Sequence, residues 1–273
     1  MQLTDTHCHI QSAGYQDGER STREIWAKQP ELTRTQLVER AVAGNVTKMI
    51  CVGCDLADSQ IAVEFANTTP YTWASIGLHP HEAKDYAHNA EKLATFAALA
   101  TRQKVVAVGE CGLDYFYSYS PKSDQTTVLR FQFELAAKHN LPMIFHVRDA
   151  FDDFWPIFDE YNQAEPVRGV LHSFTDSQVN LQRAVSNGLY IGVNGIATFV
   201  KKPSQLEVYK SIPLQSMVLE TDAPFLTPVP HRGTINRPER VFDVANFLSM
   251  VHNERIETIC EATSANAQQL FNF

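Results

Sequence analysis

The sequence has little of what marks several common classes of protein. Its 273 residues carry 23 Lys and Arg against 31 Asp and Glu, and the net charge of −8 excludes the broad positive surface of a high-affinity duplex binder. The five cysteines are an odd number without the spacing of a disulfide framework, which favours a reducing compartment. No stretch approaches the ~18 apolar residues of a transmembrane helix. Any nucleic-acid substrate must therefore be engaged locally, by metal ions and a few basic residues.

The chain also lacks low-complexity runs, internal repeats and a linker-like segment. With 44% hydrophobic and 20% charged residues, it can bury one large core, so we expect residues 1–273 to form a single domain. The candidate ligands described below begin at His7, which leaves no room for a cleavable signal sequence. We therefore expect a cytoplasmic protein with no membrane association and no obligate protein partner.

Short apolar runs alternate with helical patterns along the whole chain, which is typical of repeated β-α units and a parallel sheet. Eight such strands in a chain of this length predict an α/β fold, the TIM (β/α)8 barrel. The predicted strands are Gln2–His7, Thr47–Val52, Thr72–Ile76, Val105–Gly109, Pro142–His146, Gly169–His172, Leu189–Val193 and Met217–Glu220.

The clearest helical patterns cover Leu32–Ala43 and Val128–His139. Ser177 and Thr263 are predicted N-caps of two later helices. The motif Cys51-Val52-Gly53-Cys54 has no second pair, and we interpret it as ordinary buried thiols after a strand rather than as a redox or metal site.

Three long loops follow predicted strands, on the face where barrel enzymes keep their chemistry. They are Gln11–Pro30, Tyr115–Gln125 and Ala223–Arg240. The second loop holds Tyr115, Phe116, Tyr117 and Tyr119, whose rings can stack on nucleic-acid bases. For Tyr117 and Tyr119 we favour the alternative, in which they only cover the end of the barrel.

Metal-competent side chains stand at the ends of most of the predicted strands. In Asp5-Thr6-His7-Cys8-His9, the alternation of a strand places both histidines on one face. Later strand ends supply further candidates, and all of them project to the same rim of a barrel, which predicts a metal site there. These candidates are His79, Glu110, His146, His172 and Asp222.

The chemistry of this set fits two divalent ions. Apart from His79, which is considered below, four imidazoles and two carboxylates are too many for one tetrahedral site and suit two open sites that share a bridge, for which Glu110 is the natural candidate. A water between two cations loses a proton near neutral pH and becomes the nucleophile, and Asp222 is placed to accept that proton. Zn²⁺, Mn²⁺ and Mg²⁺ all remain possible.

These motifs resemble those of the TatD family of metal-dependent hydrolases in the amidohydrolase superfamily. The matching segments are Asp5–His9, Gly77–Pro80, Val108–Tyr115, Pro142–Ala150, Gly169–Phe174, Leu219–Phe225 and Asn266–Phe271. The resemblance implies a TIM barrel, two metal ions and deoxyribonuclease activity, often 3′→5′ exonucleolytic, on single-stranded DNA or 3′ ends. It implies two ligand sets, which are His7, His9, Glu110 and Asp222 for one ion, and Glu110, His146 and His172 for the other.

Two neighbouring residues are predicted to act on the substrate. Arg148 shares the strand face of His146 and can hold a phosphate bidentately, the alternative being a salt bridge to Asp149 or Asp152. His79 either contacts the scissile phosphate or donates to the leaving oxygen, the alternative being a purely structural histidine of the turn. We expect Asp114 and Glu220 to orient the ligands, as carboxylates beside metal residues commonly do.

Three segments depart from the family pattern, namely Ile10-Gln11, Thr175-Asp176 and Asn236-Arg237-Pro238. None includes a candidate ligand, but the first and last border the expected substrate pocket. Our main hypothesis is therefore two-metal hydrolysis of DNA phosphodiesters. The alternatives are hydrolysis of small esters, lactones, amides or aminoacyl-tRNA by the same centre, and a non-catalytic binding barrel, which would leave gaps in the ligand set.

Overall fold

Strands and helices alternate throughout the computed structural model, which describes residues 1–14 and 21–273. The order of the strands along the sheet is their order in the sequence, the topology of a TIM (β/α)8 barrel, so the predicted fold class is confirmed. The strands are β1 (Leu3–Cys8), β2 (Val46–Val52), β3 (Thr72–Ile76), β4 (Val105–Asp114), β5 (Met143–Arg148), β6 (Gly169–Leu171), β7 (Tyr190–Val193) and β8 (Met217–Leu219).

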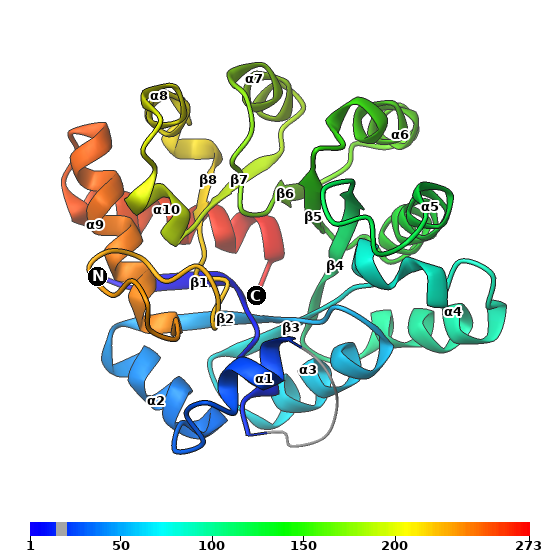
Figure 1. Cartoon of the computed structure of the whole chain (residues 1–273), viewed down its shortest axis with the longest axis horizontal. Helices are drawn as coiled ribbons and strands as arrows, with labels where there is room; N and C mark the ends of the chain where they lie inside the picture. The colour runs from blue at the N-terminus through cyan, green and yellow to red at the C-terminus, as the bar shows by residue number, and fades with distance from the viewer. Residues whose placement is uncertain (15–20) are drawn as a thin grey trace. The chain divides into compact units, whose positions relative to one another are not determined.

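Helices separate successive strands in the sequence (Figure 1). Those among the described residues are α1 (Ser21–Trp26), α2 (Arg34–Ala43), α3 (Leu56–Thr68), α4 (Ala90–Ala97), α5 (Lys122–His139), α6 (Phe151–Ala164), α7 (Gln178–Ser186), α8 (Pro203–Ser211), α9 (Val241–His252) and α10 (Ile256–Phe271). None of the helices in this part of the chain combines the length and the apolar character needed to cross a bilayer.

The chain divides into two compact units, each made of several segments. The first comprises Met1–Cys51, Thr69–Thr72 and Ser173–Gln269. In it β1 pairs with β2 and β7 pairs with β8, both in parallel, and a bridge joins Cys8 to Ala223 just after β8. Buried apolar side chains of these strands form its core, among them Met49, Ile191 and Val218.

The second unit comprises Val52–Thr68, Trp73–His172 and Leu270–Phe273. Here β3, β4, β5 and β6 form consecutive parallel pairs. Helix α5 packs against β4 and α6 against β5 (Figure 1). A group of aromatic side chains fills the space between α5, β5 and α6, including Phe133, Phe145, Phe154 and Phe158.

Most predicted boundaries differ from the observed ones by one or two residues, and three differences are larger. Strand β4 continues past Gly109 to Asp114, because residues 111–114 pair in register with residues 145–148 of β5. Helix α5 begins at Lys122, inside the predicted loop Tyr115–Gln125. Thr263 is not an N-cap, since it lies within α10 and its Oγ1 donates to the carbonyl of Ile259 at 2.8 Å, as helical threonines do.

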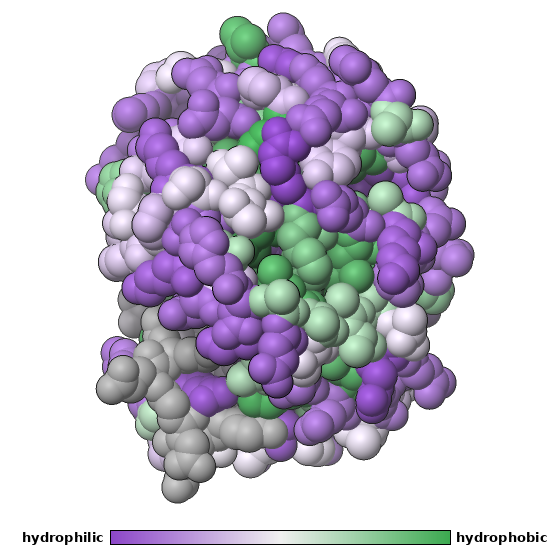
Figure 2. Space-filling model, turned by 90° about the vertical axis from the view of Figure 1, so that its right-hand side faces the viewer, coloured by the Kyte–Doolittle hydropathy of each residue, from purple (hydrophilic) through white to green (hydrophobic). Residues whose placement is uncertain are grey.

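Other local predictions hold. Ser177 caps α7 by accepting a hydrogen bond from the Asn180 amide, and Thr33 forms a capping box at the start of α2. The predicted loop Gln11–Pro30 contains α1, while residues 15–20 of it lie outside the described residues. The face drawn in Figure 2 is mostly hydrophilic, with a group of hydrophobic residues at its centre.

Candidate metal centre

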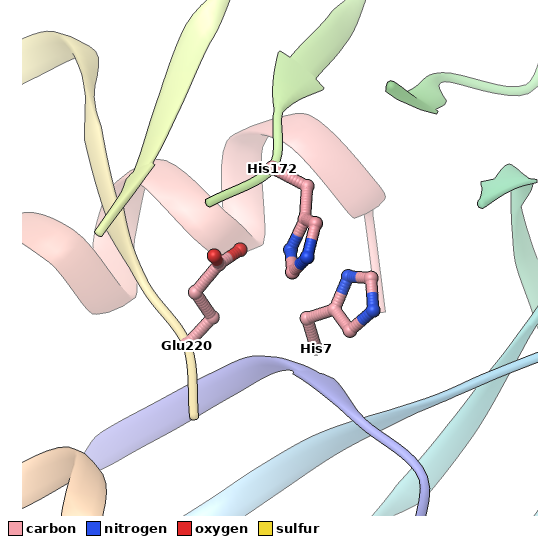
Figure 3. Close-up of side chains that lie close together, drawn as sticks. All are labelled: His7, His172 and Glu220. Carbon is pink, nitrogen blue, oxygen red and sulfur yellow. The ribbon is translucent and has the colours of Figure 1, made fainter. Parts of the chain in front are cut away.

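Three of the predicted ligands come together in the first unit. Asp222 Oδ1 lies 3.3 Å from His9 Nε2 and 3.7 Å from His7 Nε2, and the two imidazole rings are 5.1 Å apart. All three side chains are buried or nearly so. Figure 3 shows His7 rising from β1. We call His7, His9 and Asp222 the first donor group.

The backbone fixes the first donor group directly. The amide of Asp222 donates to the carbonyl of His7, and the amide of His9 donates to the carbonyl of Ala223, both at 2.8 Å. Asp222 has φ of +58°, a conformation that costs a non-glycine residue free energy and that concentrates at functional sites. The indole of Trp26, in α1, donates to the carbonyl of His9 at 3.1 Å, so the insert after β1 supports this group.

Two buried carboxylates flank the first donor group. Asp5 accepts hydrogen bonds from the amide and the hydroxyl of Thr221, and burial raises the pKa of this carboxyl to about 8 although those bonds lower it. Glu220, which follows β8 (Figure 3), accepts from the Ser173 amide at 2.7 Å and from the Asn194 side chain at 3.1 Å. Both tie strand ends of this unit together, as expected of groups that position ligands.

The second unit gathers imidazoles around Glu110. Oε1 of this carboxylate lies 2.9 Å from His146 Nδ1, 3.5 Å from His79 Nε2 and 3.9 Å from His172 Nε2. His172 follows β6 (Figure 3). Glu110 is buried and lies within β4 rather than after it, because that strand extends to Asp114. We call Glu110, His79, His146 and His172 the second donor group.

Glycines let the strands of this unit approach closely. Gly112 pairs with His146 across β4 and β5, has φ of +149°, and any Cβ there would overlap the His146 carbonyl oxygen. A Cβ at Gly77 would likewise overlap the backbone of Glu110. The glycines of Gly77-Leu78-His79 and of the segment after Glu110 are thus required by close backbone contact.

Asp114 orients the imidazole of His146. Its Oδ2 lies 2.9 Å from His146 Nε2 and 3.0 Å from His81 Nε2, while its Oδ1 accepts from the amides of Phe116 and Tyr117. Burial opposes charge on His146, but its hydrogen bonds to Asp114 and Glu110 outweigh this and raise its pKa to about 9. Burial raises the pKa of Asp114, yet its hydrogen bonds with His146, His81 and the Tyr117 amide hold that pKa well below its usual range.

His81 was not among the site residues predicted from the sequence. It is the second histidine of Gly77-Leu78-His79-Pro80-His81, and this doubling is the signal that could have identified it. Its side chain shares the Asp114 carboxylate with His146, and its ring lies 4.3 Å from that of His79. His81 thereby packs directly against the second donor group.

His79 is neutral at physiological pH. Burial lowers its pKa to about 4, although Glu110 favours the charged form. Its Nδ1 accepts from the His81 amide, so the ring proton resides on Nε2, which faces Glu110. A neutral imidazole in this tautomer can donate a hydrogen bond to an oxygen but is a poor source of a whole proton.

Arg148 lies at the end of β5 and is exposed. Its Cζ sits 4.0 Å from the centroid of the Phe116 ring and 4.9 Å from that of Tyr117, a cation–π arrangement. Among the described residues it makes this contact rather than an ion pair with Asp149 or Asp152. A guanidinium carries its N–H donors along its planar edge, a geometry that suits a phosphate or carboxylate oxygen.

The composition of both groups fits divalent metal ions. In each, two imidazoles and a carboxylate place donor atoms within 4.8 Å of one another, as His7, His9 and Asp222 do and as His79, Glu110 and His146 do. Mixed nitrogen and oxygen donors suit Zn²⁺ or Mn²⁺, whereas Mg²⁺ prefers oxygen. The structure therefore offers candidate metal-binding groups built from residues that the sequence predicted.

Comparison with known proteins identifies relatives along nearly the whole chain. A family model described as TatD related DNase matches residues 4–272. The uncharacterized metal-dependent hydrolase YabD of Bacillus subtilis is 36% identical over 269 residues, which cover 98% of each protein. The 3′-5′ ssDNA/RNA exonuclease TatD of Salmonella typhimurium is 32% identical over 244 residues, covering 87% of this chain and 92% of that protein.

Solved structures agree with this result. The crystal structure of YJJV, a TatD homolog from Escherichia coli K12, superimposes with a TM-score of 0.83 at 28% identity, covering 99% of this chain and 98% of the other. The resemblance predicted from the motifs is therefore confirmed.

Proposed function

This chain belongs to the TatD related DNase family and is a metal-dependent hydrolase, and from that premise we propose that it hydrolyses DNA phosphodiesters at single-stranded or 3′ ends, as a 3′→5′ exonuclease. The observation that carries the proposal is that each unit gathers two imidazoles and a carboxylate, with an exposed arginine beside the second donor group. The relative from Salmonella typhimurium, named as a 3′-5′ ssDNA/RNA exonuclease, supports the choice of substrate.

In this proposal the first donor group holds one divalent ion, and Glu110, His146 and His172 hold a second. Such ions, when bound, lower the pKa of water and neutralise charge that develops on a phosphate. The identity of the ions, Zn²⁺, Mn²⁺ or Mg²⁺, is a prediction from the sequence.

The side chains themselves have separate roles. Asp222 accepts the proton of the attacking water. Arg148 binds a non-bridging phosphate oxygen through the edge of its guanidinium. His79, neutral and protonated on Nε2, donates a hydrogen bond to the substrate phosphate rather than a proton to the leaving oxygen, because burial holds its pKa at about 4.

A nuclease assay with matched variants tests the proposal. The purified protein is given a 5′-labelled oligonucleotide with a 3′ overhang, before chelation, after chelation, and after each divalent ion is restored. We expect chelation to abolish cleavage and restoration to recover it. Replacing a residue that orients a metal ligand typically costs about 10- to 100-fold in activity. Glu110→Gln and Asp222→Asn change proposed ligands themselves, so their turnover should fall by more than about a hundredfold.

Glu160→Gln is the matched control. Glu160 lies on α6, is exposed and pairs with Arg130 of α5, so the protein should tolerate its replacement. A panel of small esters, lactones and amides is assayed in parallel. Cleavage of that panel without cleavage of the oligonucleotide would refute nucleic acid as the substrate, and wild-type turnover by Glu110→Gln would refute the role of the second donor group.

A further inference from the structure

The loop between β4 and α5 presents three large aromatic side chains to solvent. The exposed fractions of Phe116, Tyr117 and Tyr119 are 56%, 46% and 58%. The rings of Tyr117 and Tyr119 are parallel, with centroids 5.4 Å apart, and Phe116 meets Tyr117 edge-on at 4.9 Å. Side chains that merely cover a core would be buried, whereas a contiguous exposed aromatic group marks a binding surface. We call these three residues the aromatic platform.

The platform is held in place by Asp114, which also contacts His146 of the second donor group. The Asp114 carboxylate that orients His146 also accepts the amides of Phe116 and Tyr117, at 3.0 and 2.9 Å. His81, bonded to the same carboxylate, contacts the rings of Tyr119 and Tyr117 at 4.8 and 5.4 Å. One buried carboxylate therefore fixes both a candidate metal ligand and the platform beside it.

A second set of contacts fixes the far side of the loop. The Gln125 side chain accepts from the Asp114 amide and donates to the carbonyls of Asp114 and Ser120, at 2.8 to 3.1 Å. The Ser120 hydroxyl in turn donates to the His81 carbonyl at 2.7 Å. The platform is consequently preorganised, which reduces the entropy lost when a ligand binds to it.

Arg148 adds a positive charge to the platform. Its guanidinium stacks on Phe116 and Tyr117, so its position is set by the rings. Aromatic faces beside a cation match a chain of alternating bases and phosphates. In a protein with net charge −8, such local stacking can supply affinity that a diffuse positive surface does not.

We propose that Phe116, Tyr117 and Tyr119, together with Arg148, bind the terminal unpaired bases of a single-stranded nucleic acid and so select single strands over duplex. Bases within a duplex are stacked on one another and cannot reach the platform, whereas unpaired bases can. This inference rests on the proposed function, because the platform would hold the strand whose phosphodiester is hydrolysed beside Glu110 and His146.

Direct binding tests the platform separately from hydrolysis. The probe is a labelled oligothymidylate with phosphorothioate linkages throughout, which resists cleavage, and the protein is loaded with Mn²⁺. We expect Tyr117→Leu/Tyr119→Leu to weaken binding about tenfold to a hundredfold, the range for losing one or two stacked bases. Tyr119→Phe keeps the ring and should bind like wild type, as should Phe242→Leu, which removes a ring that is 40% exposed on α9.

An oligonucleotide whose last three nucleotides lack bases completes the test. Wild-type protein should bind this abasic probe at least as weakly as the leucine double variant binds the intact probe. The change from intact to abasic probe should weaken binding less for the variant than for wild type, because the variant already lacks the contacts of Tyr117 and Tyr119. Wild-type affinity of the double variant for the intact probe, or equal losses on the abasic probe for both proteins, would overturn the platform.

The outcome also separates this inference from the proposed function. Base-dependent binding by wild type without any cleavage of a natural oligonucleotide supports the platform and refutes the exonuclease. Cleavage by the leucine double variant with wild-type KM refutes the platform and leaves the exonuclease standing. Absence of oligonucleotide binding by the wild-type protein refutes both.

Discussion

The hydrogen bond between Asp114 and His146 should control how metal affinity depends on pH. In the metal-free protein the pKa of His146 is about 9, because Asp114 and Glu110 outweigh the effect of burial. A metal ion requires the neutral imidazole, so binding below that pKa must displace a proton. Each pH unit below about 9 therefore costs wild-type protein about tenfold in apparent affinity, or roughly 1.4 kcal/mol.

The substitution Asp114→Asn should change metal affinity in two ways that have opposite signs. In wild type, the Asp114 carboxylate lies 2.9 Å from His146 Nε2. In the variant, the side-chain oxygen of the new asparagine can still accept from the Phe116 and Tyr117 amides, but His146 has lost its charged partner at this position. Loss of orientation should lower metal affinity about 10- to 100-fold. Loss of the charge also lowers the pKa of His146, so less of the binding free energy is spent on removing a proton.

The variant should therefore bind nearly as well as wild type at pH 7 and clearly more weakly above pH 9. Competition with a chromophoric chelator, measured across this range with Zn²⁺, reports the dissociation constant directly. Wild-type affinity should rise about fiftyfold between pH 7 and 9, while the variant shows a shallower slope. Asp124→Asn is the matched control, since Asp124 pairs at 3.3 Å with the exposed His88.

Parallel pH profiles for wild type and Asp114→Asn, with the same affinity at pH 9 and above, would refute the reasoning. Such a result would mean that the carboxylate neither holds the proton on His146 nor orients its ring. Thermal unfolding of each variant confirms that the comparison is made between folded proteins.

Three further outcomes follow from the same geometry. Gly112→Ala should lower the free energy of unfolding, measured by chemical denaturation, by about 2–5 kcal/mol, because a Cβ would overlap the His146 carbonyl oxygen. Gly188→Ala is its control and should lower it by about 1 kcal/mol, because Gly188 has a positive φ but open space around it. Saturating metal at about 1,000 times its Kd should raise wild-type stability by about 4 kcal/mol in thermal unfolding, and Glu110→Gln should lose most of that gain. Arg148→Lys should raise the KM for oligonucleotide about tenfold with little change in kcat, since an ammonium cannot bind a phosphate in the planar bidentate way; an unchanged KM would contradict the phosphate role.

The positions of the strands were predictable because their signal is local. Runs such as Val105–Val108 and Met217–Leu219 are apolar without interruption, as strands buried on both faces are. The end of β4 was not predictable in the same way. Residues 110–114 include a buried glutamate and a glycine, which look like the end of a strand, and only their pairing with β5 keeps them in the sheet.

The candidate ligands were predictable because they follow recognisable motifs, but their supporting contacts were not. Nothing in the spacing of Asp114, His81 and Tyr117 indicates that one carboxylate would join all three. Thr263 illustrates the converse failure, since a threonine beside a polar turn resembles a cap until its helix is seen to begin at Ile256. Hydrogen bonds between residues far apart in the chain decide the first case and the full extent of α10 decides the second, and neither can be read from the residues nearby.

The most direct test of this account is an anomalous difference map from a crystal of the protein loaded with Zn²⁺ or Mn²⁺. The account predicts peaks about 2.0–2.2 Å from His7, His9 and Asp222 and from Glu110, His146 and His172. Full metal occupancy at other residues, with these side chains unligated, would contradict it.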